Sequence, residues 1–382
     1  MKIDFYRHQL KAADAEAVAK VLATPFLTTG AVCHQVEAQL AAYFGLPHAL
    51  LVNSWTNGAL AALLAMGLGP DDEVILPANT FIATANVVEL SKAKIVFADV
   101  DPDSLLLTPA LAEPLVTNRT RVVVPVHLYG QMCDVKGLRA MLDRHPAAAG
   151  HIAILEDAAH CFEGEREGNK PGRHSDLAIF SFYATKNVTC GEGGAIVTGD
   201  SELYRRLLES RLHGMSATAA DRFRGGGYNH WDMMRLGTKA NMPDLLAALL
   251  PAQISTIDAR LPRRRAVAER YRAAFADGPL RLVSQLPSCK SAEHIFPIGV
   301  RGGRRDDAIV ALNEAGVPVT VNYRSVVGTT YYRGRYGDLT ALCPVSHQWG
   351  LETLTLPLYP DLTEMEQEHI IETVRSQLYL LT

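Results

Sequence analysis

The chain has 382 residues, more than one domain usually contains, which predicts a large domain accompanied by a smaller one. Hydrophobic residues make up 48% of it and charged residues 20%, so the chain can bury a substantial core. The formal net charge of -4 argues against nucleic acid or an anionic membrane as a partner, and no apolar run approaches the roughly 18 residues of a membrane-spanning helix.

The cysteines and the first residues favour a cytoplasmic protein. The first ten residues lack the apolar segment of a secretory signal peptide. The six cysteines are scattered and form no Cys-x-x-Cys pair, which favours reduced thiols over disulfides or a zinc site. These residues are Cys33, Cys133, Cys161, Cys190, Cys289 and Cys343.

Helix-like and strand-like patterns alternate from residue 52 to residue 197. Residues 53–69 begin with cap-forming polar residues and continue in alanine and leucine, which predicts a helix. The strand-like runs are β-branched or aromatic and lack polar alternation, as in strands that helices cover on both faces. We expect a three-layer α/β domain with a mixed, mainly parallel sheet. The runs are residues 73–77, 94–101, 120–130, 151–161, 177–182 and 195–200.

The character of the sequence changes near residue 242. Residues 242–276 predict one long or kinked helix, with Pro251 and Pro262 as its expected interruptions. Strands are expected at residues 294–300 and 317–321 and a helix at 306–316. A C-terminal helix follows Thr363, where Thr363 and Glu366 have the spacing of a capping box. We therefore expect residues 1–250 to form the large domain, and residues 251–382 to form a linker helix and a small α+β domain.

Polar side chains follow the ends of several predicted strands or open the helix at residue 53. In open α/β sheets, ligands bind beyond the carboxyl ends of the strands, so these side chains should converge at one edge. They are Ser54, Thr56, Asn57, Phe81, His127, Tyr129, Glu156, Asp157, His160, Tyr183, Thr185 and Lys186.

Four of these features share a chemical logic. A helix start rich in hydroxyls, such as that around Thr56, binds phosphate. The Asp157 carboxylate could keep a pyridinium nitrogen protonated, and Phe81 could cover a flat ring. A partly desolvated lysine such as Lys186 loses its proton more easily and can form a Schiff base. Together they describe a binding site for pyridoxal phosphate.

Each residue also has a purely structural interpretation. Lys186 alone is better explained as a surface lysine, Asp157 as a helix cap, Phe81 as a core residue and Thr56 as an N-cap. A single histidine such as His160 is more often structural than catalytic. The cofactor site is favoured because the features occur together and in a sensible chain order.

Several motifs resemble those of the DegT-type aminotransferases, fold-type I enzymes that use pyridoxal phosphate and usually act on nucleotide-linked keto sugars. The stretch "SFYATKNVTCGEGG" resembles the family's lysine motif, "EDAAH" its aspartate motif and "NSWTNGAL" its phosphate helix. Similarity extends from "FLTTGAVCHQVEAQLAAYFG" to "CPVSHQWGLETLTLPLYPDLT", nearly the whole chain. The resemblance implies the aspartate aminotransferase-like fold.

The resemblance also implies roles for individual residues. Lys186 would form the Schiff base and carry the proton, Asp157 would pair with the pyridine nitrogen, and His160 would lie near the phenolic oxygen. Asn241 resembles an asparagine that some members extend to the partner subunit's phosphate, which implies a homodimer. The remaining cofactor contacts would be Trp55, Thr56, Phe81 and Ser181, and the substrate contacts Thr29, Tyr183, Asn322, Tyr323 and Arg324.

Three features depart from the commonest pattern of the family. Trp55 is bulky for the phosphate helix, where the family uses mainly the backbone. "TKAN" replaces the more frequent Asn-Tyr-Arg, and this change affects the assignment of Asn241 as a cofactor contact. "VNYRSVV" replaces the usual His-Tyr pair near the substrate, which leaves the sugar open and allows a keto sugar acid without a nucleotide.

These features predict an aminotransferase that moves an amino group from glutamate to a keto sugar, with neither nucleic acid nor membrane as partner. One alternative is a sugar dehydratase, but such relatives carry histidine in place of Lys186. A non-catalytic accessory protein is the second. A nicotinamide dehydrogenase is disfavoured because no Gly-x-Gly-x-x-Gly follows the first strand. Arg324, Arg333 and Arg335 could bind a phosphate or carboxylate or be solvated, and residues 263–265 are expected on the exposed face of a helix.

Overall fold

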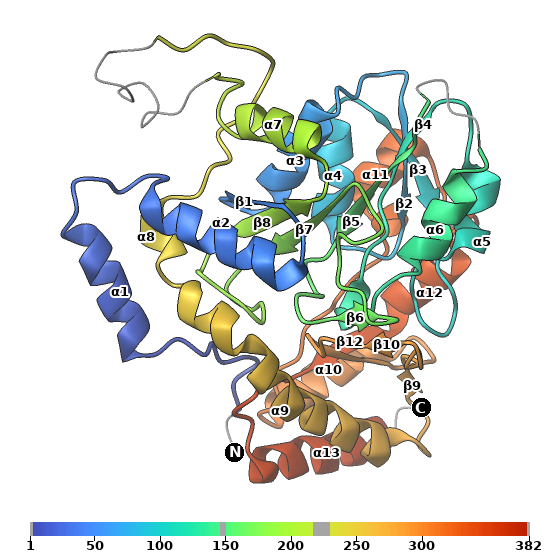
Figure 1. Ribbon diagram of the computed structural model, residues 1–382. Coiled ribbons are helices and arrows are strands. Elements are labelled where there is room, and N and C mark those ends of the chain that lie inside the picture. Colours follow the sequence, from blue (N-terminus) through green and yellow to red (C-terminus); the bar gives the residue numbers. More distant parts are fainter. Residues whose placement is uncertain (1–2, 146–149, 217–229, 380–382) are drawn as a thin grey trace.

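The computed structural model describes residues 3–145, 150–216 and 230–379, and a seven-stranded sheet forms its centre (Figure 1). The strand order is β1-β8-β7-β5-β4-β2-β3, and β8 runs antiparallel to both of its neighbours while the other pairings are parallel. The expected mixed, mainly parallel sheet is confirmed. Its strands are β1 (His48–Val52), β2 (Glu73–Pro77), β3 (Lys94–Ala98), β4 (Thr120–Val123), β5 (Ala153–Asp157), β7 (Leu177–Ser181) and β8 (Gly194–Thr198).

Helices cover both faces of this sheet, because alternate residues of each strand point to opposite sides. In β7, Leu177 and Ile179 pack against one layer, and Ala178 and Phe180 pack against the other. The first layer contains α3 (Trp55–Ala65), α4 (Ile82–Leu90) and α7 (Ser201–Ser210). The second contains α2 (Ala31–Phe44), α5 (Pro109–Ala112), α6 (Val135–Leu142), α8 (Asp244–Ala247) and the start of α9 (Pro251–Phe275).

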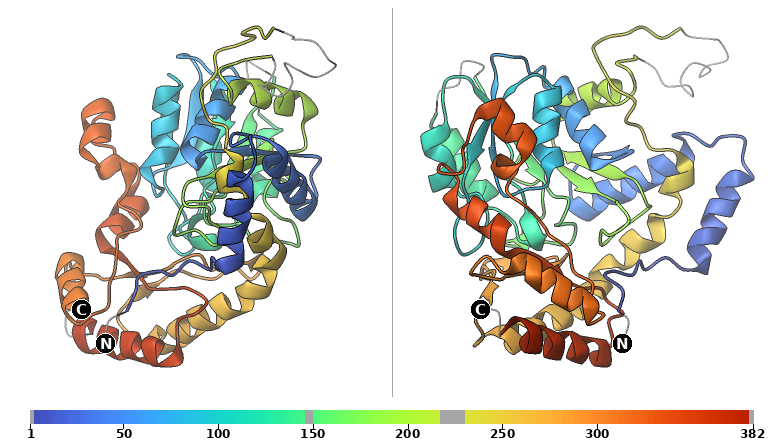
Figure 2. Two further views of the ribbon diagram at one scale, coloured as in Figure 1. Left: turned by 90° about the vertical axis from the view of Figure 1, so that its left-hand side faces the viewer. Right: turned by 180° about the vertical axis from the view of Figure 1, so that it is seen from behind.

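The C-terminal part has a separate hydrophobic core, in which α9, α10 and α13 enclose a small sheet (Figure 2). This sheet has the order β12-β11-β9 and is antiparallel. Ile3 is only 3% exposed and packs in this core, so the N-terminal segment is anchored here before it runs to α1. The elements are β9 (Arg281–Leu282), β11 (Phe296–Gly299), α10 (Arg305–Glu314), β12 (Thr353–Leu356) and α13 (Glu364–Leu378).

The remaining elements connect or flank these two parts. Strands β6 and β10 form an antiparallel pair. In the described ranges, no helix is long and apolar enough to cross a lipid bilayer. The elements are α1 (Ala12–Leu22), β6 (Glu165–Arg166), β10 (Cys289–Lys290), α11 (Thr330–Tyr336) and α12 (Pro344–Glu352).

The structure corrects four local expectations. Strand β1 was not predicted, because its sequence HALLV suits a helix as well as a strand. The predicted strand at residues 317–321 is reduced to one bridge between Thr320 and Thr355, and Pro318 removes a backbone donor from it. Pro262 lies inside α9 without ending it, since the carbonyl that it deprives of a bond belongs to the exposed Asp258.

The fourth correction concerns the arginine run of α9. Arg263 is exposed as expected, but Arg264 is 6% exposed and turns inward. Its guanidinium donates to the backbone oxygens of Glu293 and His294 at 3.4 and 3.3 Å. The run is therefore split between solvent and the contact of α9 with the segment before β11.

The capping box of α13 gives a test of local stability. The Thr363 hydroxyl accepts from the Glu366 amide at 3.2 Å, and the Glu366 carboxylate accepts from the Thr363 amide at 2.8 Å. Thr363→Ala should lower the free energy of unfolding by about 1 kcal/mol in urea titration, because an amide at the helix start loses its partner. Thr330→Ala, an exposed position at the start of α11, is the control and should change it by much less.

Candidate active site

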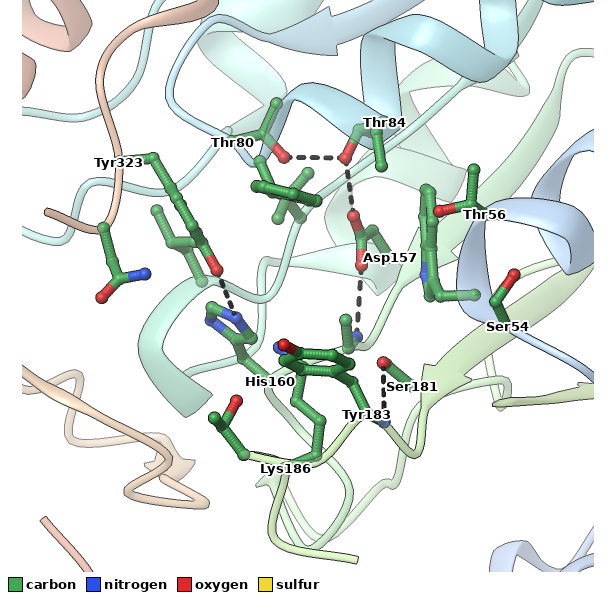
Figure 3. A pocket seen from close by; sticks show the side chains of 18 of the residues that line it. Ser54, Thr56, Thr80, Thr84, Asp157, His160, Ser181, Tyr183, Lys186 and Tyr323 are labelled. Carbon is green, nitrogen blue, oxygen red and sulfur yellow. Dashed lines mark hydrogen bonds between the residues drawn. The ribbon is translucent and has the colours of Figure 1, made fainter. Parts of the chain in front are cut away.

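A cavity of about 560 Å³ opens beyond the carboxyl ends of β5 and β7, where the sequence predicted a site (Figure 3). The loops and helix starts around the seven-stranded sheet supply most of its wall, and the segment after α10 and Phe5 of the N-terminal segment supply the rest. Thirteen of the residues named from the sequence line it: Ser54, Trp55, Thr56, Phe81, His127, Asp157, His160, Ser181, Tyr183, Thr185, Lys186, Asn322 and Tyr323.

Lys186 enters the cavity from the loop that follows β7. Its backbone amide donates to the Tyr183 oxygen at 2.9 Å, which fixes the turn carrying the side chain. Burial lowers the pKa of the Lys186 amine from 10.5 to about 8, and attraction to the Asp157 carboxylate opposes this shift. A substantial fraction of the amine is therefore uncharged and nucleophilic at mildly alkaline pH.

Asp157 is the last residue of β5 and is 5% exposed. Burial raises the pKa of its carboxyl, while hydrogen bonds from the Thr84 hydroxyl and the Ala159 amide and the charge of Lys186 favour the ionised form. The Thr84 bond is 2.9 Å long, and the Thr80 hydroxyl lies 2.8 Å from that of Thr84. This chain of hydroxyls orients the carboxylate toward the cavity, and sequence reasoning missed both threonines (Figure 3).

The first turn of α3 forms another part of the wall. Ser54 is its N-cap and accepts from the Asn57 amide at 3.1 Å, so the predicted helix start is confirmed. Gly194 of the neighbouring β8 lies so close that a Cβ added to it would be 3.0 Å from the backbone nitrogen of Trp55. The backbone at the helix start is thus tightly packed, and its free amides and the hydroxyls of Thr56 and Ser181 can meet an anion.

His160 stands across the cavity from this helix. Its Nδ1 lies 3.3 Å from the Tyr129 amide nitrogen and its Nε2 lies 3.1 Å from the Tyr323 hydroxyl. Burial holds the pKa of His160 well below 6.5, so the ring is neutral. The ring centroid of His294 lies 4.4 Å away, a contact with no signal in the sequence because His294 comes from a distant segment.

Two predicted residues lie together outside the cavity of their own chain. The Asn241 amide donates to the Thr29 hydroxyl at 2.7 Å, and that hydroxyl donates to the Met242 oxygen at 2.6 Å. Asn241 also bridges to Val52 at the end of β1. This pair therefore borders the start of α3 rather than lining the cavity.

The arginines named from the sequence also lie away from the cavity wall. Arg324 is exposed and does not line the cavity. Arg333 pairs with Asp338 at 2.9 Å and Arg335 lies 3.5 Å from Glu89. Within the described ranges, Lys186 is the cationic side chain that lines this cavity.

Comparison with known proteins identifies the family of this chain and similar solved structures. The model of the DegT/DnrJ/EryC1/StrS aminotransferase family matches residues 8–375. The sugar aminotransferase Spr1654 from Streptococcus pneumoniae, in its pyridoxamine phosphate (PMP) form, is 28% identical in sequence with a TM-score of 0.93. The match covers 100% of both chains. DesV from S. venezuelae is 32% identical over 98% of both chains with a TM-score of 0.88. The sugar aminotransferase CalS13 from Micromonospora echinospora is 27% identical over 98% of this chain and 99% of its own, with a TM-score of 0.87.

The lowered pKa of Lys186 makes stability depend on pH. Between about pH 8 and pH 10.5 the Lys186 amine is protonated in the unfolded chain and largely neutral in the folded chain. The free energy of unfolding therefore rises with pH across this window, and this increment is lost as the pH falls to about 8. In cofactor-free protein, Lys186→Met should remove an increment of up to about 3 kcal/mol across this window, measured by urea titration. Lys136→Met, at an exposed lysine, should leave the dependence of the unfolding free energy on pH unchanged. An equal dependence in the Lys186→Met and Lys136→Met variants would contradict the lowered pKa of Lys186.

Proposed function

We propose that this chain, which belongs to the DegT/DnrJ/EryC1/StrS aminotransferase family, transfers an amino group from glutamate to a keto sugar, with a nucleotide-linked keto-deoxysugar as the favoured acceptor. The protein is a pyridoxal phosphate-dependent aminotransferase, as are this family and its members solved in PLP and PMP forms. The main support for the proposal is that Lys186, whose amine is partly uncharged, and the buried Asp157 carboxylate line the same cavity at the edge of the sheet.

The residues present fit this cofactor. The start of α3 with Thr56 and Ser181 would hold the phosphate, and the Asp157 carboxylate would accept a hydrogen bond from a protonated ring nitrogen. Asp157 forms no salt bridge with another side chain in the described ranges, so its charge is available for that nitrogen. Phe81 is 51% exposed and lines the cavity, where its ring can cover a planar group.

The bound cofactor supplies an aldehyde for imine formation and a ring that delocalises electrons. Lys186 would hold the cofactor through its Nζ and, when free, would move the proton at the amino-bearing carbon of the substrate. Asp157 would keep the ring nitrogen protonated. His160 remains neutral in its buried position and therefore adds no charge beside Lys186.

Both substrates would use this one cavity in turn, which requires ping-pong kinetics. Asn322 and Tyr323 line the wall on the small-domain side and are the candidate sugar contacts, and the exposed Tyr183 stands at the opposite side. We also propose a homodimer in which Thr29 and Asn241 serve the partner's site. Their position outside their own cavity supports this assignment, as does the buried Asn241 Oδ1, which has no partner in the described ranges.

Lys186→Ala tests the proposed chemistry. The parent, loaded with cofactor, should absorb near the visible edge and bleach when glutamate is added, and mass spectrometry should detect an aminated product with a panel of keto sugars. Lys186→Ala should lower the rate of transamination at least about a thousandfold, because the variant loses the amine that would form the imine and carry the proton. Lys136→Ala, at an exposed lysine, is the control and should retain the parent rate. Turnover of Lys186→Ala at the parent rate would contradict the proposed mechanism.

Asp157→Asn tests the role of the buried carboxylate. A neutral amide cannot stabilise a cationic ring in a low-dielectric pocket, so kcat should fall on the order of a hundredfold or more. Asp277→Asn, at an exposed aspartate, should retain parent activity. Steady-state kinetics with glutamate and the best keto sugar measures both, and parent-like kcat in Asp157→Asn would show that the carboxylate has another role.

A further inference from the structure

The hydrogen bonds on the His160 ring have a fixed direction. A backbone amide only donates, so the Tyr129 N–H, 3.3 Å away, requires an unprotonated Nδ1. The ring is neutral because burial holds the pKa of His160 well below 6.5, and its single proton therefore sits on Nε2. From there it donates to the Tyr323 hydroxyl oxygen at 3.1 Å (Figure 3).

This direction leaves the proton of Tyr323 available. The hydroxyl oxygen accepts from His160 and also from the Asn322 side chain, whereas within the described ranges no side chain accepts the Tyr323 proton in turn. Burial raises the pKa of Tyr323 above 10, so the phenol stays protonated. A protonated phenol that lines a cavity without an internal acceptor is a donor for whatever the cavity binds.

Tyr323 stands on the wall that faces the proposed cofactor site. Thr320, Asn322 and Tyr323 line the cavity from the segment after α10, whereas Asp157 and Lys186 come from the large sheet. The segment is tied down, because the hydroxyl of Tyr129 donates to the Asn322 oxygen at 2.7 Å. Trp349 Nε1 in turn donates to the Tyr129 hydroxyl at 2.8 Å.

We propose that Tyr323 donates a hydrogen bond to the ketone oxygen of the sugar substrate, and that His160 is a positioning residue that fixes the direction of this bond. The inference rests on the proposed function, since it requires a keto substrate. It makes Tyr323 a specificity-determining contact of the acceptor half of the reaction.

The chemistry of the donor selects this ligand atom. The chain from Tyr129 through His160 to Tyr323 carries no net charge, which suits a neutral carbonyl oxygen. A buried carboxylate, such as those of glutamate, is stabilised best by a charged partner. An ammonium group has no lone pair and cannot accept from Tyr323. The hydroxyl therefore distinguishes the ketone from both the amino donor and the protonated amino product.

Tyr323→Phe is the direct test, because it keeps the ring and removes the donor. With the keto sugar that the parent aminates best, kcat/KM should fall about tenfold, the effect of one neutral hydrogen bond. The rate of bleaching by glutamate and the absorbance maximum of the loaded enzyme should stay at the parent values. Tyr331→Phe, at an exposed tyrosine outside the cavity, is the matched control and should retain both half-reactions.

A pair of His160 variants tests the positioning role. His160→Gln keeps an N–H donor near the place of Nε2 and should retain most of the parent's kcat/KM for the sugar. His160→Leu removes the donor and should lower it. In the His160→Leu background Tyr323→Phe should cause little further loss, because the direction of the phenol is already lost. Equal, additive losses would show that His160 does not act through Tyr323.

The possible outcomes separate this inference from the proposed function. If the parent aminates no keto sugar, the proposed function fails and the inference fails with it. If the parent is active and Tyr323→Phe has an unchanged kcat/KM for the sugar, the inference alone is wrong. It is also overturned if Tyr323→Phe slows the glutamate half-reaction equally, or if it shifts the absorbance maximum, which would make the cofactor's phenolic oxygen the acceptor.

Discussion

The structure depends on one electrostatic compromise, the burial of a lysine amine near a buried carboxylate. Burial lowers the pKa of Lys186 and raises that of Asp157, and the attraction between the two charges opposes both shifts. Parallel strands make the meeting possible, since β5 and β7 pair in register with Asp157 opposite Ile179, shortly before the loop to Lys186. The Thr84 hydroxyl then completes the environment of the carboxylate. Sheet geometry thus brings the Lys186 amine and the Asp157 carboxylate to one edge of the sheet.

Tyr129 connects the two walls of the cavity. It is a non-glycine residue with a φ of 63°, a left-handed conformation that costs free energy and persists when surrounding contacts determine it. Its amide donates to the His160 ring, and its hydroxyl donates to the Asn322 oxygen and accepts from the Trp349 indole. One strained residue therefore sets both the tautomer of a histidine on the large domain and the position of the segment opposite.

A second buried network holds the loop of Lys186 from behind. The side-chain amide of Asn187 donates to the Glu163 carboxylate at 3.0 Å, and its oxygen accepts from His294 Nδ1 at 3.0 Å. The backbone oxygen of His294 accepts from Arg264 on α9. Because each of these groups has a hydrogen-bond partner, the network can be buried without the penalty of an unpaired polar group, and it links the reactive loop to α9.

Local sequence patterns account for part of the fold and of the candidate site. Six strands of the large sheet, the helix capped by Ser54 and the capping box at Thr363 follow from residue type and spacing, and the rule about strand ends was enough to bring Lys186 and Asp157 to one edge. Contacts between distant segments arise from the packing of the folded chain: Thr84 and Asp157 are 73 residues apart and His160 and Tyr323 are 163 apart. It also turned Arg264 inward and reduced the strand at residues 317–321 to a single bridge. Such outcomes depend on which surfaces pack together, and the short-range periodicity of a sequence does not contain that information.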